Sequence, residues 1–489
     1  MNTYRNLLWI PIVLWVAASV SGRAEIPTEA EALDAVNKAV RFFREAVSTE
    51  GGYLWQYSAD LSRREGEGKA DDRTVWVQPP GTPSVGLAYL DAYQMTGERF
   101  LLEAAVETAG ALVRGQLESG GWEYRIVFDP VKRLEYAYRE PPGRSDGKNT
   151  TTLDDDTTQA ALRLLMRVDQ ALGFADDRIH EASLYGLESL IKAQYVNGAW
   201  PQRYSSPSDP DAFPVKQASY PATWSRTHPG TDYSAHCTFN DNTIGDVIAT
   251  LCDAARIYSE PRYRAAAEKG GRFILLAQMP DPQPGWAQQY DEEMHPAWAR
   301  KFEPPAITGG ESQGVMRTLI HLYRETGNAA FLEPLPRALE YYRRSLRPDG
   351  RLARFYELQT NRPLYFTKTY EITYEDDDMP THYSFVVTSR LDDIEAEYQK
   401  VLAERPRDAT IQLGRKPKLT DRLSESARRI LDDLDERGAW VESGRLRYHG
   451  DDDPTTRVIR CATFIRNLGV LSEFLAAVRT GDGEAQAAK

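Results

Sequence analysis

The chain has 489 residues, of which 72 are acidic and 59 basic, giving a formal net charge of −13. Hydrophobic residues make up 41% and aromatic residues 10% of the sequence, a composition that excludes a disordered chain and supports a sizeable core. The acidic excess argues against a nucleic-acid-binding protein, because contacts to phosphate require a basic face. A polyanionic ligand would need locally concentrated cations or a bound metal ion that bridges like charges.

The N-terminus, MNTYRNLLWIPIVLWVAASVSGRA, has the three parts of a secretory signal peptide. Arg5 supplies the positive charge, residues 7–18 form an apolar stretch too short for a comfortable membrane span, and small residues around 19–24 suit cleavage. We expect residues 1–24 to be removed and the mature protein, secreted or periplasmic, to have no membrane segment. An uncleaved membrane anchor is the alternative.

A helical repeat runs through most of the chain. Each copy predicts one amphipathic helix, a short break, a second helix and a loop that carries glycine and an aromatic residue. In the second copy, apolar residues recur at three- and four-residue spacing at Leu162, Leu165, Val168 and Leu172. The four copies begin near Thr82, Thr157, Thr243 and Ser312.

The chain begins and ends with partial repeats. A single helix is expected over residues 29–47, ahead of the loop GGYLWQY, and further helices over 391–402, 420–436 and 457–478. A chain that starts with half a unit and ends with the other half can close a ring. We therefore predict an all-α fold, an α/α toroid of repeated helical hairpins with Gly-aromatic loops and short β segments on its rim. An open superhelical stack of hairpins is the alternative.

The toroid is predicted to be a single domain over residues 25–489, in which helices within 391–479 close the ring. Long insertions rich in Pro and Asp, such as residues 205–236, are expected to decorate the rim. Helical solenoids usually keep their turns short, so these long loops favour the toroid, and long loops in compact domains are commonly functional. The three cysteines, Cys237, Cys252 and Cys461, allow at most one disulfide and match no zinc-site spacing.

Carboxylates stand at the start of two of the predicted first helices. The second copy begins TTLDDDTTQ, with Asp154, Asp155 and Asp156, and the third begins CTFNDNTIG, with Asp241. One Asp per helix is explained by N-capping, but three consecutive aspartates repel one another unless a cation lies nearby. Oxygen ligands from adjacent repeats on one rim suit a hard cation such as Ca²⁺.

Two further features point to the same rim. The Gly-aromatic loops carry Trp122, Trp200 and Trp286, which could either stack on sugar rings or plug the ends of the hairpins. The stretch ARKFEPPAITGGES sets Arg300 beside Lys301 in a chain that is acidic overall. The alternative for these two cations is a solvated loop.

Six blocks of the sequence run in a recognisable order: TTLDDDTTQAALR (151–163), NGAWPQRY (197–204), CTFNDNTIGDVI (237–248), WAQQYD (286–291), ARKFEPPAITGGES (299–312) and LARFYELQTNRPLYF (352–366). Together they resemble the pectic acid lyases, the tenth family of polysaccharide lyases, and occur in family order over residues 151–366, the family-like core. The sequence departs from the family pattern in two places: Asp155 and Asp156 replace an Asn-Gly pair, and Arg203 replaces an aromatic residue.

The resemblance implies calcium-assisted β-elimination on polygalacturonate, with Arg300 as the base that removes the C5 proton. Free guanidinium titrates above pH 12, so this role requires desolvation and nearby cations. Alternatively, Arg300 holds the substrate carboxylate while His236 or Lys301 takes the proton. The expected Ca²⁺ ligands are Asp154, Asp155 and Asp241. The first two compete for one place, because a direct alignment of the two internal repeats pairs Asp155 with Asp241. The expected substrate-binding residues are Lys301, Arg354, Arg362, Trp200 and Asn240.

Two other functions remain compatible with the sequence. An inverting glycoside hydrolase on the same fold would use two carboxyl groups, Asp241 with Asp291 or Asp154. A non-catalytic glycan-binding toroid would need the aromatic and arginine side chains but would not shorten the polysaccharide. In each case the expected partner is an acidic polysaccharide, and we expect a monomer.

Overall fold

The computed structural model describes residues 26–404 and 417–487, and within them it contains twelve α-helices. The predicted signal peptide lies outside the described residues. The helices are α1 (Glu29–Phe42), α2 (Thr82–Thr96), α3 (Arg99–Gly115), α4 (Thr157–Ala171), α5 (Asp177–Lys192), α6 (Thr243–Tyr258), α7 (Pro261–Ala277), α8 (Glu311–Thr326), α9 (Leu335–Arg344), α10 (Leu391–Ala403), α11 (Asp421–Asp432) and α12 (Cys461–Ala487).

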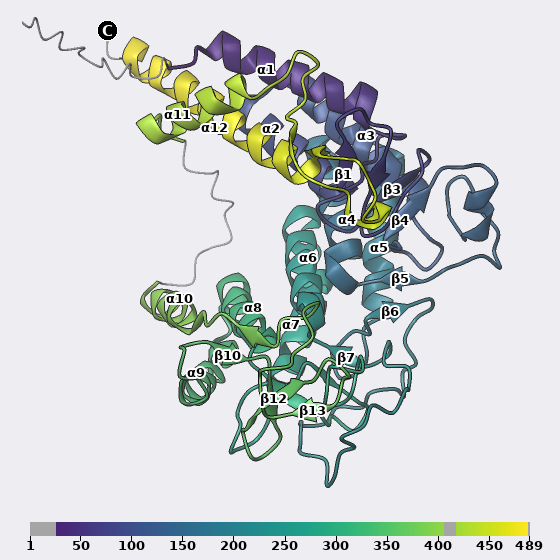
Figure 1. Cartoon of the computed structure of the whole chain (residues 1–489), viewed down its shortest axis with the longest axis vertical. Helices are drawn as coiled ribbons and strands as arrows, with labels where there is room; N and C mark the ends of the chain where they lie inside the picture. The colour runs from purple at the N-terminus through teal and green to yellow at the C-terminus, as the bar shows by residue number, and fades with distance from the viewer. Residues whose placement is uncertain (1–25, 405–416, 488–489) are drawn as a thin grey trace, which may run out of the picture.

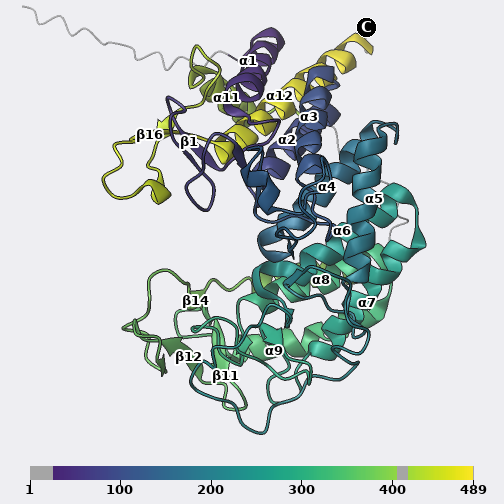
Figure 2. The same cartoon turned by 90° about the vertical axis from the view of Figure 1, so that its right-hand side faces the viewer.

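The hairpins stack side by side along the chain. The first helices of successive hairpins contact one another in the order α12, α2, α4, α6, α8, α10, and each of α2, α4 and α6 packs on the second helix that follows it. Figures 1 and 2 show the helices following a strongly curved arc, with α10 and α11 at its two ends. The predicted all-α, toroid-type arrangement of helical hairpins is confirmed.

The two ends of the described chain complete one unit between them. Helix α1 packs against α12, and α12 continues the row of first helices by packing on α2. The strand Arg457–Arg460, which leads into α12, pairs with the strand Gln56–Ser58, which follows α1. The prediction of a helix from residue 457 was therefore wrong at its start, because residues 457–460 are held extended by this pairing.

Short strands line one rim of the arc. In four hairpins the strand that enters the first helix pairs antiparallel with the strand that leaves the second helix: β3 with β4, β5 with β6, β7 with β8, and β9 with β11. The predicted short β segments on the rim are thus present. The strands are β1 (Gln56–Ser58), β2 (Arg64–Glu65), β3 (Thr74–Trp76), β4 (Arg125–Val127), β5 (Thr151–Thr152), β6 (Arg203–Tyr204), β7 (Cys237–Thr238), β8 (Gln289–Tyr290), β9 (Ala306–Thr308), β10 (Leu352–Ala353), β11 (Phe355–Glu357), β12 (Pro363–Phe366), β13 (Ile372–Thr373), β14 (Val386–Val387), β15 (Glu442–Ser443) and β16 (Arg457–Arg460).

Among the described helices, one segment, Cys461–Thr480 of α12, is long and apolar enough to cross a membrane. Most of it is buried against α1, α2 and α11, as expected for a core helix. The three cysteines are buried and unpaired. Burial raises the pKa of each thiol.

The tryptophans of the Gly-aromatic loops close the ends of the hairpins. Trp200 is fully buried, and its indole Nε1–H donates to the carbonyl of Leu190 at 2.8 Å. Trp122 and Trp286 repeat the arrangement, donating to the carbonyls of the preceding helices at 2.8 and 2.9 Å. The predicted stacking of Trp200 on sugar was wrong, because a fully buried ring that seals its helix end cannot contact a ligand.

We expect Trp200→Phe to lower the free energy of unfolding by about 2–4 kcal/mol, through the lost packing volume and the unpaired carbonyl of Leu190. Urea unfolding measures this change. Trp224→Phe is the matched control, because Trp224 is partly exposed in a loop. Equal stability of both variants would contradict the plugging role.

Candidate functional site

Asp155 and Asp241 occupy equivalent places in adjacent repeats. In both, a short rim strand leads into a 3-10 turn and then into a first helix, α4 or α6. The backbone repeats almost to the degree: φ is 50° at Asp155 and 46° at Asp241, and 58° and 59° at the following Asp156 and Asn242. Asp and Asn tolerate this left-handed conformation better than most residues. The turn aims both carboxylates at the same rim, and it confirms the alignment that pairs Asp155 with Asp241.

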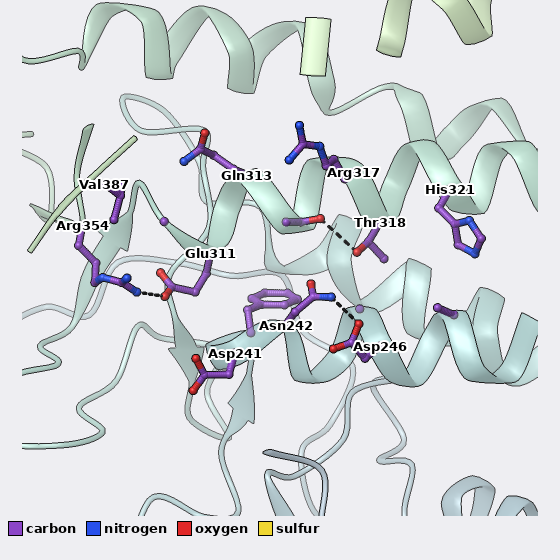
Figure 3. Close-up of a pocket in the computed structure, with 15 residues that line it drawn as sticks. Asp241, Asn242, Asp246, Glu311, Gln313, Arg317, Thr318, His321, Arg354 and Val387 are labelled. Atoms are coloured by element: carbon purple, nitrogen blue, oxygen red, sulfur yellow. Dashed lines mark hydrogen bonds and ion pairs between the residues drawn. The ribbon is translucent and has the colours of Figure 1, made fainter. Parts of the chain in front are cut away.

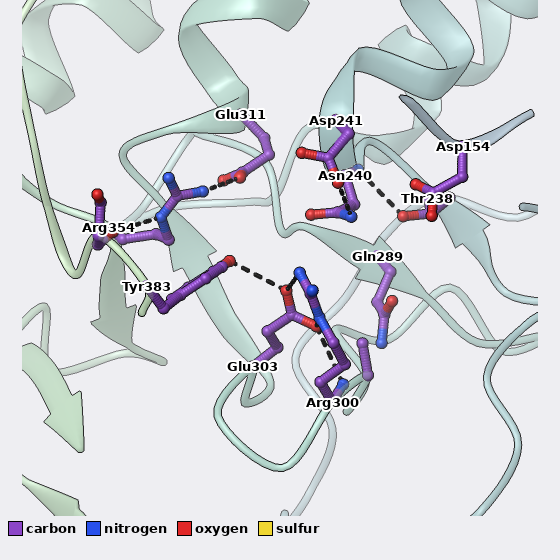
Figure 4. Close-up of polar contacts among 12 residues, drawn as sticks. Asp154, Thr238, Asn240, Asp241, Gln289, Arg300, Glu303, Glu311, Arg354 and Tyr383 are labelled. Carbon is purple, nitrogen blue, oxygen red and sulfur yellow. Dashed lines mark hydrogen bonds and ion pairs between the residues drawn. The ribbon is translucent and has the colours of Figure 1, made fainter. Parts of the chain in front are cut away.

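The turns bring together three carboxylates. One oxygen from each of Asp154, Asp155 and Asp241 lies within 4.8 Å of the others. Each carboxylate accepts one hydrogen bond from a neutral donor: Asp154 from the hydroxyl of Tyr124 at 2.7 Å, and Asp155 from Nε2 of Gln78 at 2.8 Å. Asp241 accepts from Nδ2 of Asn240 at 2.6 Å (Figure 4). Asn240, a predicted substrate-binding residue, is itself buried, and its amide is engaged within the site.

The acidic cluster fits a hard cation. Oδ1 of Asp154 is buried and has no hydrogen-bond partner, so an acceptor points into the site with nothing to satisfy it. The pKa of Asp155 is raised to about 7, first by burial and then by the charges of Asp154 and Asp241. Burial and the charge of Asp154 raise the pKa of Asp241 to about 6, with Arg300 opposing the shift. Oxygen donors that repel one another in this way are suited to Ca²⁺.

Arg300 faces this cluster from the loop before β9. Its guanidinium forms a two-pronged ion pair with Glu303, at 2.8 Å from Nε and 2.6 Å from Nη2. Glu303 is 2% exposed and also accepts from the hydroxyl of Tyr383 at 3.0 Å. Burial lowers the pKa of Arg300, but Glu303 outweighs this effect and the net pKa lies above its ordinary value. In this arrangement Arg300 is therefore protonated.

Arg354 approaches the same region from β10 and β11. Its Nη1 is ion-paired with Glu311, and its Nε donates to the carbonyl of Ser384 at 2.7 Å. The ring of Tyr383 lies 4.7 Å from the Arg354 guanidinium and 5.4 Å from that of Arg300. Figure 4 shows Tyr383 between the two guanidinium groups, with Glu311 between Arg354 and Asp241.

Other predicted site residues lie against different partners. The ammonium of Lys301 rests 3.6 Å from the ring centre of Tyr370, and the guanidinium of the exposed Arg362 lies 3.4 Å from that of Tyr374. Burial lowers the pKa of His236, so its ring is neutral at neutral pH. Among the residues that the structure describes, none of these three side chains forms a hydrogen bond, ion pair or ring contact with Arg300 or with the three aspartates.

A groove leads away from Asp241 between α6 and α8. It has a volume of about 620 Å³ and is lined at one end by Asp241, Glu311 and Arg354. Farther along it, Asp246 and Arg317 add charged groups (Figure 3). The groove therefore offers space for an extended ligand that begins at the carboxylate cluster.

The family model described as pectic acid lyase matches residues 116–347. This match includes the three aspartates and Arg300. Residues 116–347 belong to the pectic acid lyase family. No curated protein matches the chain.

Solved structures similar to the chain include the family 10 polysaccharide lyase from Cellvibrio cellulosa, at 22% identity over 66% of this chain and 98% of that one, with a TM-score of 0.45. A mutant of that lyase in complex with trigalacturonic acid matches at 20% identity over 65% and 98% of the two chains, also with a TM-score of 0.45. A D-mannose isomerase matches at 13% identity over 92% and 97%, with a TM-score of 0.42.

The sequence did not single out several side chains that contact the three aspartates or Arg300. Glu303 lies in the same short stretch as Arg300, and a carboxylate three residues from a predicted base was a signal that could have been used. Tyr383 and Gln78 reach the site from segments outside the matched region, and no local pattern marks them. Tyr124 follows Trp122 in a Gly-aromatic loop, where its hydroxyl is indistinguishable from other rim aromatics by sequence.

The raised carboxyl pKa values predict how stability depends on pH when no cation is bound. A carboxyl group whose folded pKa exceeds its unfolded value of 3.8 destabilises the fold as it ionises. We expect the free energy of unfolding to fall between about pH 4 and pH 7 in the presence of a chelator. Asp155→Asn should remove much of this pH dependence, so that the fall in the free energy of unfolding over this range is smaller by about 1 kcal/mol or more.

Urea unfolding over this pH range measures the effect. Asp291→Asn is the control, because the Asp291 carboxylate accepts backbone N–H groups of Glu293 and His295 in a turn. A pH dependence identical in wild type and Asp155→Asn would show that the carboxylates do not repel one another as the structure indicates.

Proposed function

We propose that the protein is a calcium-dependent lyase that cleaves polygalacturonate by β-elimination. The observation that carries the proposal is the meeting of three carboxylates and two arginines on one rim, beside a groove. Membership of residues 116–347 in the pectic acid lyase family supports the class of reaction. Secretion or export to the periplasm is part of the proposal and rests on the predicted signal peptide alone.

The charges suit this substrate. Every ring of polygalacturonate carries a carboxylate, and the proton at C5 becomes acidic only when the charge of the adjacent carboxylate is neutralised. A Ca²⁺ ion held by Asp154 or Asp155 together with Asp241 would neutralise uronate charge and bridge an acidic protein to an acidic polymer. Arg300 and Arg354 bind the uronate carboxylates and stabilise the charge that develops as the C5 proton leaves.

Arg300 is the proposed proton acceptor, and Glu303 sets the condition for that role. While Glu303 is paired with the guanidinium, the proton stays on Arg300. Acceptance of the C5 proton therefore requires the bound substrate to weaken this ion pair and the guanidinium first to lose a proton to solvent. If the pair persists, Arg300 serves as a carboxylate-binding group, and another group takes the proton.

The rival hydrolase is less well supported. Asp291, one candidate acid, is engaged in capping a turn, and the remaining pair, Asp154 and Asp241, approach within 4.8 Å. An inverting hydrolase separates its carboxyl groups by about 6.5–9.5 Å to leave room for water. The alternative of a glycan-binding protein without activity does not account for the clustered carboxylates.

Digestion of polygalacturonate by the purified protein tests the proposal directly. We expect unsaturated products, detected by their ultraviolet absorbance, to accumulate with calcium and to stop when a chelator is added. Asp241→Ala should lose about 10²-fold or more in turnover while keeping its circular dichroism spectrum. New reducing ends without ultraviolet absorbance would indicate a hydrolase, and unshortened polymer would indicate a binding protein.

Arg300→Lys separates the two roles of Arg300. If Arg300 is the base, the variant should lose about 10²–10⁴-fold in turnover, and the wild-type rate should rise toward alkaline pH. The measurement is the pH–rate profile of both proteins at saturating calcium. Arg362→Lys is the matched control, because Arg362 is exposed and lies on Tyr374. An Arg300→Lys variant within about tenfold of wild type, with an unchanged pH profile, would assign the proton to another group.

A further inference from the structure

Gln78 connects the carboxylate cluster to a part of the chain outside the family match. It follows β3, and its Nε2 donates to Oδ2 of Asp155 at 2.8 Å. Its Oε1 accepts from the indole Nε1–H of Trp76 at 3.0 Å. Both side chains are 5% exposed. The matched region begins only at residue 116, so neither residue belongs to it.

Trp76 determines which way the Gln78 amide points. An indole N–H can only donate, so the atom it meets must be the amide oxygen, and the amide nitrogen must face Asp155. The ring of Trp76 is itself fixed by its neighbours. It packs so closely on Gly66 that a Cβ there would lie 2.2 Å from the ring, and the Arg125 guanidinium lies 5.6 Å from the ring centre. The backbone carbonyl of Gln78 also accepts the indole N–H of Trp55 at 2.9 Å.

The orientation of the amide has a consequence for Asp155. A neutral N–H on Oδ2 fixes the rotation of the carboxylate and leaves its negative charge in place. An arginine or lysine in the same position would neutralise that charge. Tyr124 and Asn240 do the same for Asp154 and Asp241. Among the described residues, no Lys or Arg forms an ion pair with any of the three carboxylates, so their charge remains available to a cation.

We propose that Trp76 and Gln78 are positioning residues for the cation site. The segment before residue 116 would then complete a site whose ligands lie within the matched residues 116–347. Trp76 fixes the amide of Gln78, and Gln78 fixes the carboxylate of Asp155, one oxygen of which lies within 4.8 Å of oxygens of Asp154 and Asp241. The inference rests on the proposed function, since it takes Asp155 as one of the calcium ligands.

Titration calorimetry of the purified full chain with CaCl₂, without substrate, tests this. We expect Gln78→Leu to weaken calcium binding by about tenfold or more, the usual effect of removing a partner that orients a metal ligand. Trp76→Phe keeps an aromatic ring but removes the indole N–H, which frees the Gln78 amide to rotate, and it should also weaken calcium binding. Thermal unfolding in chelator should be similar for wild type and Gln78→Leu.

Gln56→Leu is the matched control. Gln56 also donates an amide N–H to a carboxylate, Glu65 at 2.6 Å, but in the sheet of β1 and β2. It should bind calcium as wild type does. If Gln78→Leu does not fold, Trp76→Phe decides the question alone.

The outcomes separate this inference from the proposed function. Calcium affinity that falls in Asp155→Ala but is unchanged in Gln78→Leu and Trp76→Phe would overturn the positioning role and leave the cation site standing. Calcium binding that is absent from wild type, or equal in wild type and Asp155→Ala, would overturn Asp155 as a ligand and this inference with it.

Discussion

The pairing of short strands at one rim is the constraint on which the site depends. Strands of two residues, β5 and β7, hold the chain just before α4 and α6, each by pairing with a strand that leaves the second helix of its hairpin. Because α4 and α6 pack side by side, the two turns that follow the strands also come into contact. Without this pairing, the left-handed turns at Asp155 and Asp241 would be free to relax, since L-residues favour other conformations.

The site brings together three carboxylates whose mutual repulsion opposes folding. Two ionised carboxylates at 4.8 Å repel by roughly 3 kcal/mol in surroundings of intermediate dielectric constant. The neighbouring donors are a phenol and two amides, which orient the carboxylates but do not neutralise them. Such an arrangement destabilises the cation-free protein, and binding of the proposed cation would offset this cost and link the stability of the rim to that ligand.

Much of the fold followed from the sequence, because helical periodicity and repeated turns are local signals. The half units at the chain ends predicted that α1 and α12 would meet, and comparison of the two Asp-rich turns predicted the match of Asp155 with Asp241. Trp200 was misassigned because a plugging and a stacking tryptophan look alike until burial is known. Glu303 and Gln78 could not be placed, since their roles depend on contacts that no local pattern encodes.

The two arginines of the site show how an acidic protein can hold a polyanion. Arg300 and Arg354 are not free cations: each is paired with a largely buried glutamate, Glu303 or Glu311. A carboxylate of the proposed substrate would therefore have to compete with a carboxylate that the protein already supplies, so affinity would depend on what else the substrate gains. Pairing also keeps both guanidinium groups in place before substrate arrives, which reduces the entropy lost on binding. The glutamates thus weaken the attraction for any single carboxylate and would favour a polymer that engages the proposed cation and both arginines at once.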